Sequence, residues 1–130
     1  MDLTQIIGKS ASASLIVDET RTAGAMRSGG LPVFATPAMV ALMEQAACAC
    51  LAEHLAPGQT SVGTQISVAH TTASPVGASV TATAAVTAAE GRKIEFSVTA
   101  RDEKGEIGAG MHTRAIVDEE KFLQRVNEKL

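Results

Sequence analysis

The chain has 130 residues, with 11 lysines and arginines against 14 aspartates and glutamates, and it contains no tryptophan or tyrosine. This length predicts one ordinary domain that spans residues 1–130. A net charge of −3 gives no general attraction to a polyanion, and the scarcity of aromatic rings leaves little for nucleic-acid bases to stack on. No stretch approaches the roughly 18 apolar residues that a membrane span needs, and the N-terminus lacks a basic start followed by an apolar run. We therefore expect a cytoplasmic protein that binds neither nucleic acid nor membrane.

The first predicted element is a strand over residues 9–17, where apolar and polar side chains alternate with a period of two. Residues 18–35 show no sustained period and contain Gly29-Gly30 and Pro32, so we expect a connecting stretch there. The part at 24–32 lies directly before the next element. We expect it to act as a mobile cover over a pocket.

A long helix is expected next, beginning at Thr36-Pro37 and ending before Pro57-Gly58. Thr36 has the residue type of an N-cap, proline suits the first helical position, and Pro-Gly is typical of the chain just past a helix end. Apolar and mostly small residues occupy nearly every face of this segment. The helix should therefore be buried on several sides.

The only two cysteines lie inside this helix. Side chains two residues apart point about 200° away from each other on a helix, so Cys48 and Cys50 cannot form a disulfide with one another. Together with His54 they still lack the four ligands of a structural zinc site. We expect no metal and interpret both cysteines as small buried side chains.

Four segments with a period of two follow the helix, and a short amphipathic helix over residues 118–130 ends the chain. The expected strands occupy residues 62–70, 80–88, 93–101 and 107–117. Their short connections favour antiparallel neighbours and hence a four-strand meander. On the last strand, Ile107 and Met111 are expected to face the core and Arg114 to face the opposite side. The sum is an α+β fold in which a curved antiparallel sheet wraps around one long central helix.

Three polar residues interrupt the apolar pattern. Glu44 lies two turns into the apolar helix, His70 ends the apolar face of the strand that follows, and Thr36 begins the helix. A buried carboxylate is costly unless it is paired or functional, and beside a histidine it can act as a nucleophile or general base. The alternative is structural, with Glu44 facing solvent, His70 a satisfied core histidine and Thr36 only a cap. The pattern alone leaves both interpretations open.

The sequence around these residues resembles a known family. The resemblance is carried by Val33-Phe34-Ala35-Thr36-Pro37 through Met43-Glu44, by Val62-Gly63-Thr64, and by Val68-Ala69-His70-Thr71 with Ser74-Pro75-Val76-Gly77. These segments resemble the hot-dog-fold acyl-CoA thioesterases, specifically the fluoroacetyl-CoA thioesterase-like branch, over about residues 9–118. The resemblance implies a hot-dog fold, a catalytic set that falls on Thr36, Glu44 and His70, and a substrate-site glycine at Gly63.

What the resemblance implies is a hydrolase that cleaves an acyl-CoA thioester to the free acid and coenzyme A, with no metal and no bound cofactor. Glu44 would attack the thioester or activate water, His70 would protonate the departing thiolate, and Thr36 would hydrogen-bond the carbonyl or the water. Arg114, with Arg27 as a weaker candidate, is expected to meet the nucleotide part of coenzyme A at the rim. The alternative is a non-catalytic binding module for acyl-CoA or a small acid on the same fold.

Two further expectations concern the acyl group and the assembly. The fluoroacetyl-CoA specialist is expected to close its pocket with aromatic residues before the helix, and residues 24–32 contain none, so we do not expect specificity for fluoroacetate. We expect a short acyl group, although the small helix residues Ala38, Ala41, Ala46 and Ala47 leave room for a larger one. The helical rise puts Glu44 about 12 Å beyond Thr36, too far for both to touch one thioester carbonyl. We therefore expect at least a homodimer, with a tetramer as the further alternative, in which Glu44 of one subunit approaches Thr36 of the other.

Overall fold

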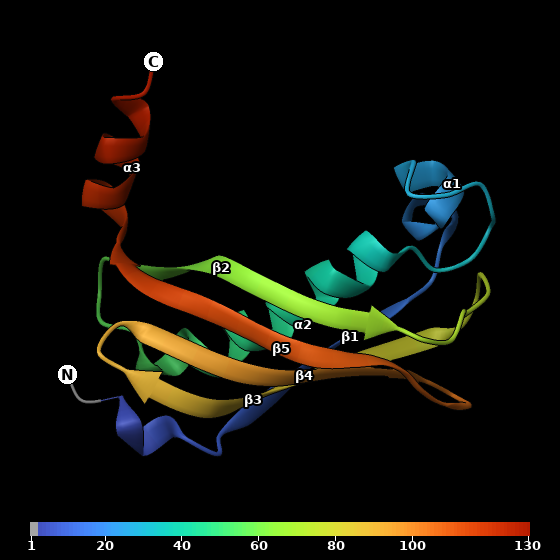
Figure 1. Ribbon diagram of the computed structural model, residues 1–130, viewed down its shortest axis with the longest axis horizontal. Helices are drawn as coiled ribbons and strands as arrows, with labels where there is room; N and C mark the ends of the chain where they lie inside the picture. The colour runs from blue at the N-terminus through green and yellow to red at the C-terminus, as the bar shows by residue number, and fades with distance from the viewer. Residues whose placement is uncertain (1–2) are drawn as a thin grey trace.

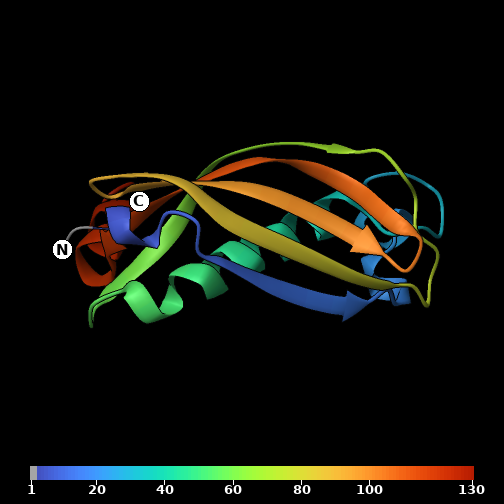
Figure 2. The ribbon, with the colours of Figure 1, turned by 90° about the horizontal axis from the view of Figure 1, so that it is seen from below.

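The computed structural model describes residues 3–130, and its main feature is a five-stranded sheet curved around one long helix (Figure 1). The strands are β1 (Ser10–Ile16), β2 (Gln59–His70), β3 (Ser79–Glu90), β4 (Lys93–Asp102) and β5 (Gly105–Asp118). The helices are α1 (Ala23–Met26), α2 (Thr36–Leu51) and α3 (Glu119–Asn127), with short 3-10 turns at Thr4–Ile6, Glu19–Arg21 and Ala52–His54. Figure 2 shows α2 lying along the concave side of the sheet. The expected α+β class, with a sheet wrapped around one long helix, is confirmed.

The order of the strands differs from the expected meander in one connection. Along the sheet the order is β1-β3-β4-β5-β2, and every neighbouring pair is antiparallel. The strands β3, β4 and β5 follow one another as expected, because each connection between them is only two residues long. The link at 71–78 is longer and carries the chain across to the other side of the sheet, so β2 pairs with β5 and not with β3. As a result β1 and β2 form the two edges.

The core lies between α2 and the sheet. The buried side chains of α2 are mostly small or flexible: Ala38, Met39, Leu42, Met43, Ala46, Ala47, Cys50 and Leu51. They meet the alternating inner residues of two central strands, Val80, Ala82, Ala84 and Val86 of β3 and Ile94, Phe96, Val98 and Ala100 of β4. The alternation predicts these two faces, with Ala88 as a further member of the first. The prediction is confirmed except for Ala88, because the register of β3 against β4 shifts between Val86 and Ala88. The small side chains allow helix and sheet to pack closely.

The two cysteines of α2 lie on different faces and both are free. Cys50 is buried as expected, whereas Cys48 is exposed, so its interpretation as a buried side chain is wrong. Within residues 3–130, no group of three or more His, Cys, Asp or Glu side chains is arranged to hold a metal ion. Over the same range, no helix combines the length and the apolar character needed to cross a membrane.

A β-bulge in β2 changes which side chains face α2. The register of β2 against β5 shifts between Gly63 and Gln65. Before the bulge Gly63 faces the helix side, next to Arg114, and after it His70 faces the same side. The alternation of the sequence predicts one face through Val62, Thr64, Ile66, Val68 and His70. This prediction is wrong for Val62 and Thr64, because the bulge inserts one unpaired residue and reverses the alternation before Ile66.

The strand β5 turns a different face towards α2 than expected. Its buried residues are Ile107, Gly108, His112, Arg114 and Ile116, whereas Met111 is 48% exposed. At Gly108 an added Cβ would lie 2.6 Å from the sulfur of Met39, so the helix packs against the bare backbone of this face. Arg114 is only 6% exposed. Its expected position on an exposed rim is therefore wrong.

Candidate active site

Thr36 and His70 form the first of two polar groups on the inner side of the sheet, and we call them the Thr36/His70 pair. Thr36 Oγ1 lies 2.8 Å from His70 Nδ1, which joins the start of α2 to the end of β2. The N-cap of α2 is Ala35, and Thr36 is already helical and makes no capping hydrogen bond. The expected capping role of Thr36 is thus wrong, and its hydroxyl is bonded to a histidine instead.

The surroundings of His70 keep the ring neutral at pH 7. Burial lowers the pKa of His70 below its ordinary value of 6.5. The ring packs edge-on against Phe34, with 6.2 Å between the ring centroids. Its Nε2 atom is buried and has no hydrogen-bond partner within residues 3–130. A neutral histidine bonded to a hydroxyl through Nδ1 can accept the proton of that hydroxyl.

A hollow of about 200 Å³ lies beside the Thr36/His70 pair. Ala23 and Ser28 line it from the segment before α2, and residues 71–73 line it from the segment after β2. The segment before α2 is held at its ends by isolated β-bridges, one between Thr22 and Phe34 and one between Val33 and Pro75. The segment at 24–32 thus borders the pair, as expected for a cover, and its mobility stays a prediction.

Glu44 and Arg114 form the second polar group, the Glu44/Arg114 cluster. Arg114 Nη1 lies 3.1 Å from Glu44 Oε2, and the same guanidinium donates to Ser61 through Nε (2.8 Å, to Oγ) and Nη2 (3.0 Å, to the carbonyl). The Glu44 side chain is 39% exposed. A Cβ at Gly63 would lie 2.6 Å from Glu44 Oε2, so the carboxylate occupies the space that glycine leaves open on β2.

His112 belongs to this cluster and was not singled out from the sequence. Its Nδ1 lies 2.8 Å from the Gln65 carbonyl oxygen, which can only accept, so Nδ1 carries the proton. Its Nε2 then accepts from Arg114 Nη1 at 3.2 Å, and the ring stacks on Phe96 with 6.1 Å between centroids. A signal was present, because His112 and Arg114 are two residues apart and must share one face of a strand.

The two groups are separate within one chain. His70 bonds Thr36, whereas Glu44 bonds Arg114, and within residues 3–130 no hydrogen bond joins His70 to Glu44. The helical rise places Glu44 about 12 Å beyond Thr36 along α2. On the sheet, His70 pairs with Gly108 while Gly63 pairs with Arg114. Inside one chain, the histidine beside Glu44 is therefore His112 and not the expected His70. Its Nε2 atom lies 4.0 Å from Glu44 Oε2.

Comparison with known proteins identifies the family of the chain. A family model described as fluoroacetyl-CoA-specific thioesterase matches residues 17–120. The chain belongs to this family. A fluoroacetyl-CoA thioesterase from Streptantibioticus cattleyicolor is 47% identical over 97 residues, which make up 75% of this chain and 70% of that protein.

Solved structures agree with this assignment. The structure of a fluoroacetyl-CoA thioesterase superposes with a TM-score of 0.90 at 38% identity, covering 95% of this chain and 96% of that one. A variant of the same enzyme with threonine replaced by serine, in complex with acetyl-CoA, superposes with a TM-score of 0.90 at 37% identity. The match covers 95% of this chain and 97% of that one. A hot-dog-like protein from Thermanaerovibrio acidaminovorans superposes with a TM-score of 0.91 at 28% identity, and the match covers 100% of this chain and 98% of that one. The hot-dog fold is confirmed, and the protein is a thioester hydrolase of the acyl-CoA class.

Proposed function

We propose that this thioesterase hydrolyses short-chain acyl-CoA to the free acid and coenzyme A at a site built around Thr36 and His70. The observation that carries the proposal is their 2.8 Å hydrogen bond beside a hollow of about 200 Å³. A hollow of this size suits a small acyl group. Relatives named for fluoroacetyl-CoA support an acyl group of the same size. The chemistry uses side chains and backbone alone, so no metal or cofactor is part of the proposal.

Thioester hydrolysis needs an activated oxygen nucleophile and stabilisation of the negative charge that develops on the carbonyl oxygen. Neutral His70 takes a proton from the Thr36 hydroxyl, which attacks the thioester carbonyl, and gives that proton to the departing thiolate. A water deprotonated by His70 then cleaves the acyl-threonine ester, which releases the free acid and restores the hydroxyl. In the direct alternative, His70 deprotonates a water bonded to Thr36, the water attacks the carbonyl, and the thiolate leaves with the proton. The first turn of α2 has backbone N–H groups without partners inside the helix. These groups, aided by the helix dipole, stabilise the oxyanion.

Glu44 as nucleophile or general base is the second mechanism that the site supports. Arg114 and His112 approach only its Oε2 atom, and within residues 3–130 no hydrogen bond engages Oε1. A half-exposed carboxylate with one unengaged oxygen can attack a thioester or activate water. Gly63 and Arg114 border this carboxylate and stay proposed substrate contacts. The burial of Arg114 argues against its contact with the nucleotide.

We further propose that two copies of the chain share each site. The strand β2 is an edge of the sheet, so one side of its backbone has no strand partner, which proteins commonly cover by association. Between Thr36 and Glu44, α2 exposes only the small side chains of Pro37 and Ala41. An antiparallel two-fold pairing along these features brings Glu44 of one copy towards Thr36 of the other. A tetramer built from such dimers stays a prediction.

The decisive test of the activity is the release of coenzyme A, measured with a thiol reagent over a panel of acyl chain lengths that includes acetyl and fluoroacetyl groups. We expect turnover to be highest for short chains. Binding of acyl-CoA without any release of thiol would instead support the non-catalytic binding module.

Single substitutions separate the two mechanisms. If Thr36 and His70 do the chemistry, Thr36→Ala and His70→Ala each lower kcat by about 10²–10⁴-fold, the usual range for a positioned acid or base, while Glu44→Gln costs less. If Glu44 is the nucleophile or base, Glu44→Gln lowers kcat by several orders of magnitude and Thr36→Ala is the milder change. Near wild-type kcat in all three folded variants would contradict both mechanisms.

A further inference from the structure

The nucleotide end of the substrate lacks the contact that the sequence assigned to it, because Arg114 is buried against Glu44. Coenzyme A carries a pyrophosphate and a ribose phosphate. A chain with a net charge of −3 must meet these groups with a local cluster of cations.

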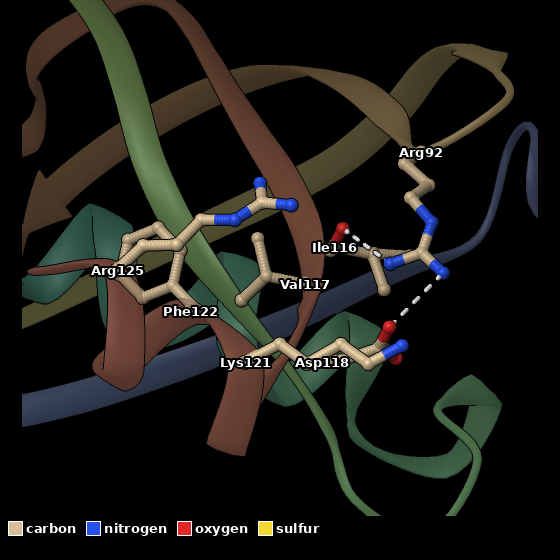
Figure 3. A pocket seen from close by; sticks show the side chains of 7 residues that line it. All are labelled: Arg92, Ile116, Val117, Asp118, Lys121, Phe122 and Arg125. Atoms are coloured by element: carbon tan, nitrogen blue, oxygen red, sulfur yellow. Dashed lines mark hydrogen bonds and ion pairs between the residues drawn. The ribbon is translucent and has the colours of Figure 1, made fainter.

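A hollow of about 370 Å³ lies where α3 leaves the end of β5 (Figure 3). Its cations are Arg92, from the turn between β3 and β4, and Lys121 and Arg125, from α3. Its one carboxylate is Asp118. We call this the α3 hollow. Its lining therefore has an excess of positive charge, in contrast to the chain as a whole.

The cations of the α3 hollow differ in whether they already form an ion pair. Arg92 Nη2 lies 3.6 Å from Asp118 Oδ2, and its Nη1 donates to the Ile116 carbonyl at 3.4 Å, so this guanidinium is tethered to β5. Within residues 3–130, no carboxylate lies within 4.0 Å of Lys121 or Arg125. These two exposed side chains are one helical turn apart on α3, and they can both bind an anion without first breaking an ion pair.

The acidic residues of α3 lie apart from Arg125 but not from Lys121. Glu119 and Glu120 line a second hollow with Pro57 and Gly58, which Lys121 and Asp118 also border. Arg125 borders only the α3 hollow. The helix thus separates charge, with Arg125 on the side that faces β5.

The floor of the α3 hollow suits a nucleoside. Phe122 and Val117 are half-buried in its lining and offer an aromatic ring and a flat apolar surface. In Figure 3, the side chains of Phe122 and Arg125 lie together on the side of Val117 away from Arg92. A purine can stack on such a ring while neighbouring cations hold its phosphates.

The α3 hollow is also within reach of the site. Val117 is three residues beyond Arg114 on β5, which is about 10 Å along the strand. The extended pantetheine arm of coenzyme A is longer than this separation. In the dimer proposed above, Thr36 of one copy approaches Glu44 of the other, so the thioester lies beside Arg114. Val117 and Arg114 point to opposite faces of β5, so the arm reaches the α3 hollow by passing around the end of the sheet.

We propose that the α3 hollow is the binding site for the phosphorylated adenosine of coenzyme A, with Lys121 and Arg125 on the phosphates and Phe122 beneath the base. The inference rests on the proposed function, since it takes the substrate to be an acyl-CoA. In this proposal, α3 supplies the positive charge that binds the phosphates of coenzyme A, which the buried Arg114 does not supply.

The test compares acyl-CoA with the same acyl group on pantetheine, which lacks the nucleotide. The variant is Lys121→Ala/Arg125→Ala, and the matched control is Lys9→Ala/Lys104→Ala, which removes two exposed lysines outside the α3 hollow. We expect the α3 variant to raise KM for acyl-CoA by about tenfold or more with kcat within twofold, because two charge-assisted contacts are lost. The constants for acyl-pantetheine should not change, and the control should behave as wild type.

A binding measurement separates this inference from the proposed activity. Adenosine 3′,5′-bisphosphate, titrated calorimetrically into the intact protein, should bind wild type and the control, bind more weakly as salt is added, and lose about tenfold or more in affinity in the α3 variant. Hydrolysis of acyl-CoA with an unchanged KM and unchanged nucleotide binding in the α3 variant would overturn the inference and leave the activity standing. Absence of hydrolysis in wild type would overturn the activity, while the titration still decides the α3 hollow.

Discussion

At the scale of single residues, the site depends on glycine and histidine positions that hold other groups in place. Gly63 leaves room for the Glu44 carboxylate, and His112 links the Gln65 carbonyl to the guanidinium of Arg114. Neither residue needs to touch the thioester to matter. Their contacts fix where the carboxylate of Glu44 lies.

Substitution of Gly63 tests this positioning. In Gly63→Ala the new methyl group would lie 2.6 Å from Glu44 Oε2 and 3.3 Å from Arg114 Nη1, so the carboxylate must move. We expect kcat to fall by about tenfold or more, since small misplacements of catalytic groups are costly. The backbone at Gly63 has no positive φ, so the thermal midpoint should fall little. A variant with wild-type kcat would show that the position of Glu44 is unimportant.

The pH dependence tests the role of His70 as base. Burial lowers the pKa of His70 below 6.5, and a histidine acts as a base only when deprotonated. Activity should therefore be constant through neutral pH and fall only as the pH drops through the lowered pKa. We expect the acid limb of kcat/KM to have its midpoint below pH 6.5. A midpoint at or above 6.5 would contradict the assignment.

The sequence singled out some of these residues and not others for a physical reason. Glu44 and His70 interrupt apolar faces, so the pattern reveals them. The strand β5 offers two alternating faces, and the more apolar one, with Met111, was expected to be buried. The structure buries the face with His112 and Arg114, because polar partners on β2 and α2 satisfy these side chains.

At the scale of elements, the periods of the sequence predicted every strand and the long helix, but not the order of the strands. Alternation is a local property, whereas pairing of β2 with β5 joins residues far apart in the chain. The bulge in β2 was likewise invisible, because it is fixed by the register against β5 and not by residue type. The start of α2 shows the same limit. The hydroxyl of Thr36 bonds His70, a residue far away in the sequence, and does not cap the helix.

The segment at 24–32 carries the prediction that belongs to this scale. It borders the hollow beside the Thr36/His70 pair, and the backbone hydrogen bonds of Gly24, Met26, Arg27 and Ser28 all stay within residues 22–31, so the segment can open without breaking the sheet. We expect its amides to exchange hydrogen faster than those of β4, and to slow when coenzyme A binds. Exchange as slow as in β4, both with and without the ligand, would contradict its role as a mobile cover.

At the scale of the whole molecule, one chain keeps its two polar groups apart. The Thr36/His70 pair lies at the start of α2, and the Glu44/Arg114 cluster lies about 12 Å further along that helix. In the proposed dimer, a two-fold axis between them brings the pair of one copy to the cluster of the other, twice. We therefore predict an active dimer with two equivalent sites.

Mixing a Thr36 variant with a Glu44 variant, each first shown to have lost activity by itself, tests this claim most directly. Thr36→Ala protein and Glu44→Ala protein are combined in equal amounts, subunit exchange is verified by mass, and the release of coenzyme A is measured. Half of the dimers are then mixed, and each has one intact site, so activity should return to about a quarter of the wild-type value. No recovery after verified exchange, or full activity in a verified monomer, would contradict a site shared between two copies.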